Sequence, residues 1–294
     1  MTRVGFFAHG GREAAVEASL ALQEALAADG VEAVDLSAGA APVDLVVAVG
    51  GDGTFLRAAL LASQIRAPIL GVKVGRLGFL TEVEPSEALA FVRRALAGEV
   101  VVEERLAVVA EPEDGGTFPP QWAMNEVMVE KRARHRLIRL RMEVDGAYIT
   151  TFSADGVIVA TPTGSTAYSF AARGPIVTPE VPCLVVTPVA AHMVFDRSFV
   201  LGASQVVVLQ VDGEEPGLVS ADGRDSQEVP VGARIRIRTS NRPVRFVHAG
   251  DSDGFLPRVR ERFGLPGDPA APDAPGGDVV EPEATDTEDV GGSG

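Results

Sequence analysis

The first hundred residues alternate between two hydrophobic patterns. Short, nearly unbroken apolar runs, typical of strands buried on both faces of a parallel sheet, occupy residues 3–8, 31–36, 44–49 and 68–74. Helix-forming segments lie between and after these runs, at residues 14–28, 55–64 and 85–97. The alternation predicts an α/β domain over residues 1–101.

After residue 98 the pattern becomes mainly strand-like. Residues 234–238 alternate strictly between Arg and Ile, as in a sheet with one face in water. Asp145-Gly146 separates two such runs and predicts a hairpin. Further strands are expected at residues 100–109, 122–130, 157–160, 184–189, 205–211 and 244–247. We therefore expect a mainly β second domain over residues 102–248, followed by a short helix over residues 255–263.

Length and charge narrow the class of protein. The 294 residues are 46% hydrophobic and 23% charged, which fits a soluble globular protein of two domains. Forty-one acidic residues against 26 Lys plus Arg give a formal charge of −15, which argues against nucleic acid or an anionic membrane as partner. Eight of the acids lie in residues 265–294 with Pro and Gly and no base, so a disordered acidic tail is expected there.

The cysteine content and the N-terminus indicate the compartment. One cysteine, Cys183 in an apolar run, rules out an internal disulfide and suggests an inert buried thiol in a reducing cytoplasm. The apolar patch after Arg3 is too short for a signal peptide. The four histidines lack the spacing of a metal site, so the metal ligands stay unknown at this stage.

The turn Gly50-Gly51-Asp52-Gly53-Thr54 is the strongest candidate for chemistry. It joins an expected buried strand to an expected helix, where α/β sheets bind ligands. Glycines admit phosphate oxygens to the backbone N–H groups at a helix start. A carboxylate in such a turn is unfavourable unless it binds a metal ion or accepts a hydrogen from a hydroxyl, so Asp52 is the best catalytic candidate. The alternative is a tight turn with a capping Asp or Thr.

Two segments of the second domain suggest a nucleoside site. Residues 155–169 run from a strand into a turn rich in hydroxyls and Gly, where Thr163, Ser165 and Thr166 suit a base or ribose and Tyr168 offers a stacking face. The alternative is an ordinary N-cap with a core Tyr. Asn125-Glu126 suits a base edge and ribose hydroxyls, and its alternative is a solvent-facing pair on a strand.

Together these motifs resemble the NAD kinase family over about residues 1–264. The motifs are GGDGTFLRAA (50–59), GRLGFLTE (75–82), NE (125–126), DGVIVATPTGSTAYS (155–169) and GPIVTP (174–179). GGDGT alone also occurs in lipid kinases and 6-phosphofructokinases, whereas its combination with the later motifs is specific. The resemblance implies an α/β nucleotide-binding domain, a β-rich NAD-binding domain and a homodimer or homotetramer. It also implies that the C-terminal segment, residues 249–264 here, packs back on the first domain.

The resemblance also implies a reaction and roles for residues. The family transfers a phosphoryl group from ATP, or from polyphosphate in some members, to the adenosine 2′-hydroxyl of NAD with Mg²⁺ or another divalent cation, giving NADP. Asp52 would accept the hydrogen of that hydroxyl, and Gly51, Gly53 and Thr54 would approach the phosphoryl donor. The residues that would contact NAD are Asp52, Gly53, Asn125, Glu126, Asp155, Thr163, Thr166, Ala167, Tyr168 and Ala190.

Some positions depart from the family pattern. Lys73, Arg173 and Ala191 stand where relatives usually carry Asn, Gly and Pro, which could alter subunit contacts or donor choice. The polar Ser153 favours ATP over polyphosphate. Two alternatives to the NAD kinase are a GGDGT-type lipid kinase and a noncatalytic NAD sensor.

Overall fold

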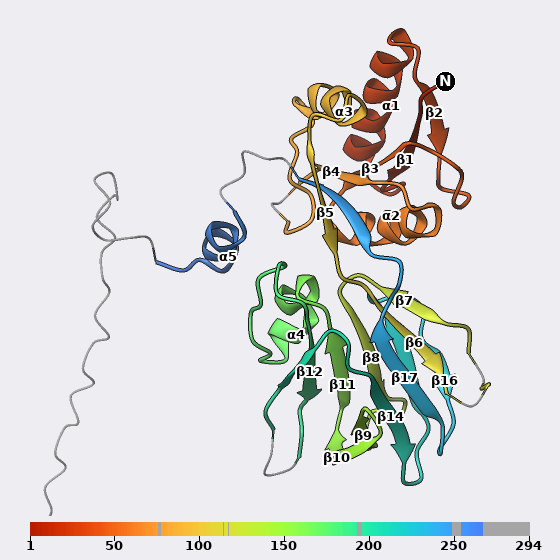
Figure 1. The fold of residues 1–294 in the computed structure, drawn as a ribbon, viewed down its shortest axis with the longest axis vertical. Helices are drawn as coiled ribbons and strands as arrows, with labels where there is room; N and C mark the ends of the chain where they lie inside the picture. The colour runs from red at the N-terminus through yellow and green to blue at the C-terminus, as the bar shows by residue number, and fades with distance from the viewer. Residues whose placement is uncertain (76–77, 114, 117, 193–195, 249–253, 267–294) are drawn as a thin grey trace, which may run out of the picture.

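The computed structural model has two lobes along its long axis, with the C-terminal helix α5 beside their junction (Figure 1). It describes residues 1–75, 78–113, 115–116, 118–192, 196–248 and 254–266. The expected tail at residues 265–294 lies outside the described residues from residue 267 onward. The upper lobe is α/β and the lower lobe is built from two β-sheets, so the expected fold class is confirmed.

A six-stranded sheet forms the centre of the first lobe. Its order is β2 (Glu32–Asp35), β1 (Arg3–Ala8), β3 (Leu45–Gly50), β4 (Ile69–Lys73), β18 (Val244–His248) and β5 (Val101–Arg105). Neighbouring strands are parallel from β2 to β18, and β5 is antiparallel to β18. All six residues of β3 are buried, as its unbroken apolar run predicts.

Helices cover both faces of this sheet. The face with Val4, Val47 and Leu70 packs against α1 (Glu13–Ala28) and α3 (Ala88–Leu96). The opposite face packs against Phe55 and three alanines of α2 (Asp52–Ile65), whose small side chains let the helix lie close to the sheet. This three-layer packing fixes the start of α2, and with it Asp52, at the carboxyl end of β3.

Two six-stranded sheets pack face to face in the second lobe. The first has the order β10 (Ala147–Ala154), β9 (Ile138–Val144), β14 (Val207–Asp212), β17 (Arg234–Thr239), β6 (Val108–Pro112) and β7 (Gln121–Ala123). The second has the order β13 (Phe199–Gly202), β12 (Cys183–Val189), β11 (Gly156–Ala160), β8 (Glu126–Lys131), β15 (Gly217–Ala221) and β16 (Gln227–Val229). Leu140, Phe152, Val159 and Leu209 belong to the fully buried core between them.

Several expectations about elements can be compared with these strands. Asp145 and Gly146 have φ angles of 52° and 83° and connect β9 to β10, so the hairpin is confirmed.

Cys183 is buried, and burial raises the pKa of its thiol. The single strand expected over residues 100–109 was wrong: the run divides into β5 and β6, which lie in different sheets. The strands β13, β15 and β16 were not expected, because short half-exposed strands lack a clear apolar run.

The chain crosses between the lobes twice. It leaves the first sheet after β5 and returns to it through β18, so residues 101–105 and 244–248 belong to that sheet. The two crossings lie side by side, because the Ser240 N–H donates to the Ala107 carbonyl oxygen at 2.8 Å. The buried Arg105 guanidinium lies 4.2 Å from the Phe246 ring centroid at the same level. The expected domain boundary after residue 101 therefore falls inside β5.

Three short helices complete the description near the junction. A 3-10 turn at Thr163–Thr166 leads into the four-residue α4 (Tyr168–Ala171), and α5 covers Phe255–Phe263. The α5 ring of Phe263 stacks on Phe170 of the second lobe at 4.1 Å between centroids. None of the helices within the described ranges is long and apolar enough to cross a membrane.

Candidate functional site

Asp52 is the first residue of α2 and is held by another segment. Its carboxylate accepts backbone N–H groups from Phe79 at 2.9 Å and from Leu80 at 3.1 Å. The N-cap residue is Gly51, which makes no side-chain cap. The alternative of an ordinary capped turn is therefore wrong, since the carboxylate is fixed from outside its own helix.

Gly78 makes this arrangement possible. A Cβ atom on Gly78 would overlap the Asp52 carboxylate, so a side chain at this position would displace either the aspartate or the loop. The GRLGFLTE motif is thus explained in part by close packing on Asp52.

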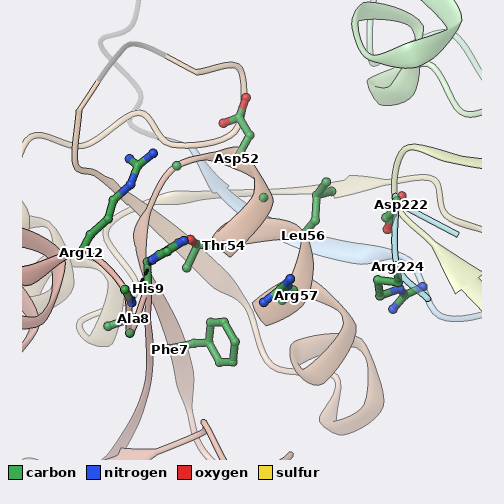
Figure 2. Close-up of a pocket in the computed structure, with 15 residues that line it drawn as sticks. Phe7, Ala8, His9, Arg12, Asp52, Thr54, Leu56, Arg57, Asp222 and Arg224 are labelled. Carbon is green, nitrogen blue, oxygen red and sulfur yellow. Dashed lines mark hydrogen bonds between the residues drawn. The ribbon is translucent and has the colours of Figure 1, made fainter.

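A cavity of about 600 Å³ lies on one side of Asp52. Figure 2 shows Arg12 and His9 on one flank of this cavity and Asp222 and Arg224 on the other, with Arg57 between them. Arg12 is oriented by a hydrogen bond to the Val74 carbonyl oxygen at 3.2 Å. The lining comes from residues 7–12, 51–54, 56–57 and 222–224. The expected donor-loop residues Gly51, Gly53 and Thr54 are all among them.

A second cavity of about 350 Å³ lies on the other side of Asp52, between the lobes. It brings together the expected residues Asp52, Asn125, Thr163, Thr166 and Ala167. The remaining lining residues are Phe79, Leu80, Phe170, Arg262 and Phe263. Asp52 thus lies in the wall of both cavities.

Asn125 and Glu126 are buried, so the alternative of a solvent-facing pair is wrong. Oδ1 of Asn125 and Oε2 of Glu126 are buried without a hydrogen-bond partner among the described residues. Buried polar atoms are rarely left unpaired unless water or a ligand completes them. These two oxygens therefore mark a place prepared for the polar groups of a ligand.

Asp222 holds this pair from the loop after β15. Its carboxylate accepts N–H groups from Met124 at 2.9 Å, from Asn125 at 2.8 Å and from Glu126 at 3.3 Å. Arg224 donates in turn to the carbonyl oxygens of Trp122 and Ala221. The Asn125-Glu126 backbone is therefore clamped from the rim of the first cavity.

The two carboxyl groups in this cluster have shifted pKa values. Burial, together with the charge of Asp222, raises the pKa of Glu126 to about 8, against a smaller lowering by the Tyr168 N–H. Burial also raises the pKa of Asp222, and the N–H groups that it accepts oppose that shift. Desolvation lowers the pKa of Arg224, although it stays a cation.

The turn after β11 packs directly on Asn125. Thr161 Oγ1 donates to the Met124 carbonyl oxygen at 2.6 Å and accepts the Gly164 N–H at 3.1 Å. A Cβ atom on Gly164 would overlap the Asn125 carbonyl group, which explains the glycine. Thr166 Oγ1 donates to the Thr163 carbonyl oxygen at 3.2 Å, leaving its lone pairs available to the cavity.

Four of the residues expected to contact NAD, namely Glu126, Tyr168, Asp155 and Ala190, line neither cavity. Tyr168 is 44% exposed, so the alternative of a core Tyr is wrong, and its side chain does not line the second cavity. Asp155 lies at the opposite end of β11 from the turn, where its carboxylate pairs with Lys131. Its N–H donates to the Val189 carbonyl oxygen at 2.9 Å, which puts it beside Ala190. Asp155 and Ala190 thus form a separate group that lines neither cavity.

The sequence analysis missed several residues of the two cavities. Asp222 had a signal, because the tetrapeptide Ser-Ala-Asp-Gly occurs both at residues 153–156 and at residues 220–223. Arg57 and Phe79 lie inside the motifs GGDGTFLRAA and GRLGFLTE, in which the resemblance implies no role for these two residues. No comparable signal identifies further missed residues such as His9, Arg12, Phe170, Arg224, Arg262 and Phe263.

An α/β lobe with a glycine-rich turn, joined to a β-sandwich lobe at one aspartate between two cavities, defines a two-lobed nucleotide-binding protein of the GGDGT kinase class. The family model "ATP-NAD kinase N-terminal domain" matches residues 4–100, and "ATP-NAD kinase C-terminal domain" matches residues 124–249. The chain belongs to the ATP-NAD kinase family.

Similar proteins and structures agree with this assignment. An NAD kinase of Rhodococcus erythropolis is 43% identical over 228 residues, covering 76% of this chain and 71% of the relative. An NAD kinase of Leifsonia xyli is 42% identical, covering 77% and 75%. An Archaeoglobus fulgidus NAD kinase in complex with ATP has a TM-score of 0.70 at 28% identity, covering 90% and 97%. Yeast NADH kinase complexed with NADH shares the fold, with a TM-score of 0.82 at 23% identity, covering 91% and 89%.

Proposed function

We propose that this protein is an NAD kinase that transfers the γ-phosphoryl group of ATP to the adenosine 2′-hydroxyl of NAD, giving NADP. The observation that carries the proposal is the position of Asp52 in the wall of both cavities. A phosphoryl donor in the first cavity and a hydroxyl acceptor in the second would meet at this carboxylate. Phosphoryl transfer depends mainly on such positioning and on neutralised charge.

The first cavity suits the donor. Positive charge around this cavity comes from Arg12, Arg57 and Arg224, and the His9 ring adds a polar group. The N–H groups at the start of α2, next to Gly51 and Gly53, add donors for phosphate oxygens. The triphosphate chain of ATP lies along this wall with its γ-phosphorus towards Asp52.

The second cavity suits the adenosine part of NAD. Asn125 Oδ1 and Glu126 offer hydrogen-bonding groups for an amino group or ribose hydroxyls, and Thr163, Thr166 and Ala167 line the opposite side. Asp52 accepts the hydrogen of the 2′-hydroxyl as general base. The Phe79 and Leu80 N–H groups hold the carboxylate in place for that step.

A divalent cation fits the residues present. Asp52 and Asp222 are two carboxylates on the wall of the first cavity, and within the described ranges no cluster of three or more candidate metal ligands occurs. One or two carboxylates completed by substrate phosphates form the usual Mg²⁺ environment. Because the Asp222 carboxylate already accepts three backbone N–H groups, Asp52 together with the phosphates of ATP would hold the ion, which when bound neutralises charge on the phosphoryl group.

The finer points of the proposal rest on the family resemblance. Asp155 and Ala190 contact the nicotinamide end of NAD, and Tyr168 contacts NAD in the pocket that adjoins the adenosine. ATP is the donor rather than polyphosphate, since Ser153 is polar. The protein acts in the cytoplasm as a homodimer or homotetramer. Neither alternative function is favoured, because all the relatives named above are NAD or NADH kinases.

One assay tests the proposal. The full chain is incubated with NAD, Mg²⁺ and either ATP or polyphosphate, and NADP is measured with an NADP-specific dehydrogenase. We expect NADP with ATP and little with polyphosphate. Calorimetric NAD binding without any NADP would select the sensor, and phosphate incorporation into lipid but not NAD would select the lipid kinase.

A further inference from the structure

We propose that Glu82 and Arg258 are positioning residues that hold α5 over the second cavity, so that Arg262 and Phe263 complete the binding site for the phosphate-bearing acceptor. The identity of the acceptor as NAD rests on the proposed function. The position of α5 rests on the contacts of the described residues alone.

A buried ion pair anchors the helix to the first lobe. The Glu82 side chain is 4% exposed and the Arg258 side chain 9% exposed, and Nη1 of Arg258 donates to Oε1 of Glu82. Nδ1 of His248, at the end of β18, lies 3.3 Å from the other carboxylate oxygen. Separating such a buried pair leaves a charge without compensation, which strongly favours one position of α5.

The same face of α5 reaches the second cavity. Arg262 follows Arg258 by four residues, which puts the two side chains on one side of a helix. Arg262 lines the cavity together with Asp52, and Phe263 stacks on Phe170 at 4.1 Å. The helix therefore connects the first lobe, through Glu82, to the second lobe, through Phe170.

The anchor and the catalytic carboxylate share one segment. Phe79, whose N–H donates to Asp52, lies three residues before Glu82. Its ring lies 6.3 Å from that of Phe255 and 5.8 Å from that of Phe263, at the two ends of α5. A shift of α5 would therefore move the residues that fix Asp52 as well as the wall of the cavity.

The charge of Arg262 indicates which kind of ligand the second cavity binds. Its side chain is exposed and has no hydrogen-bond or ion-pair partner among the described residues. The rest of the cavity wall is neutral apart from Asp52. A guanidinium in this place recognises a phosphate group on the acceptor, such as the pyrophosphate of a dinucleotide.

The test compares Michaelis constants for the two substrates. Arg258→Ala and Glu82→Gln should raise KM for NAD about tenfold or more and also lower kcat, because a shift of α5 moves both the cavity wall and the residues that fix Asp52. KM for ATP should stay within about twofold, since no residue of α5 lines the first cavity. Arg258→Lys should recover part of the loss. Arg260→Ala is the matched control on the same helix, since Arg260 is exposed and contacts neither cavity.

Each outcome supports or overturns the positioning role. If folded Arg258→Ala keeps the wild-type KM for NAD, or if KM for both substrates rises equally, the proposal is wrong. Should Arg258→Ala fail to fold, Arg262→Ala tests the same site from the surface and must raise KM for NAD. If the wild-type protein forms no NADP, the proposed function fails, yet calorimetric NAD binding by the same variants still decides the role of α5.

Discussion

The two cavities beside Asp52 differ in chemistry. Arginines from three separate segments surround the first, Arg12, Arg57 and Arg224, and it opens onto the start of α2. Neutral hydroxyls, an amide and three phenylalanine rings form most of the second. The first is built to neutralise a chain of charges, whereas the second is built to match a shape with a few directed hydrogen bonds. A substitution on one side should therefore affect one substrate more than the other.

Asp52→Asn should impair the reaction as a whole rather than the use of one substrate, because Asp52 lies in the wall of both cavities. The variant cannot accept the hydroxyl hydrogen, and kcat should fall by about 10²–10⁴-fold. The steady-state rate of NADP formation measures the loss, and calorimetry should still detect NAD. Turnover near the wild-type rate would refute the role of Asp52.

Arg57→Met should affect the donor side alone. A charge-assisted hydrogen bond contributes roughly 1.5–3 kcal/mol, so KM for ATP should rise about 10–100-fold. KM for NAD should stay close to the wild-type value. The exposed side chain of Arg57 makes no contact needed for folding, so an equal rise in both constants would contradict the division between the cavities.

Asn125→Ala should affect the acceptor side alone. Loss of one neutral hydrogen bond at about 0.5–1.5 kcal/mol should raise KM for NAD about 2–10-fold. Since Oδ1 has no partner in the free protein, the melting temperature should change little. A large rise in KM for ATP instead would show that the two sites are not separable here.

Glu126→Gln should change the pH dependence of stability. The pKa of Glu126 is raised to about 8, so the folded state holds a proton that the unfolded state releases above its ordinary pKa of 4.5. Stability is therefore lost as the pH rises from about 4.5 to 8. The amide removes that loss, and the variant should gain on the order of 1–3 kcal/mol over the wild type at pH 8 but little at pH 5. Denaturant unfolding at both pH values measures the difference.

Truncation in the acidic tail should have the smallest effect. Ending the chain after Pro266 should leave kcat unchanged and alter only solubility, since the tail has no aromatic residue and consists mainly of Pro, Gly, Ala and acidic residues, which bury too little apolar surface to pack on either lobe. Ending it after Gly264 also removes the Leu265 N–H, which donates to the Arg260 carbonyl oxygen at 2.9 Å and closes α5. Activity should still be retained there, and its destruction would contradict the prediction.

The sequence predicts the turns at residues 50–54 and 161–166 as parts of the site, because each combines the end of a strand with a turn that contains glycine. Asp52, Asn125 and Thr163 could be named in this way, and the structure brings them to one cavity. Arg224 and Arg262 could not, because their place depends on pairings across about a hundred residues or more, and no local pattern encodes such pairings. Asp222 has only the repeated tetrapeptide as its signal. The structure also gives a physical reason for one departure from the family pattern. Arg173 has a φ of 67°, the left-handed conformation that favours glycine, and the resemblance leads us to expect Gly at this position.

The return of β18 to the first sheet has a consequence for protein synthesis. The strand between β4 and β5 is Val244–His248, so ribosomes must add residues 106–243 before that sheet can close. At about 5–20 residues per second this delay is on the order of ten seconds. During it the nascent first lobe exposes the unpaired backbone N–H and C=O groups along the edge of β4, and the inserted sandwich has time to fold first. We expect chaperones to meet this chain at that stage of its synthesis.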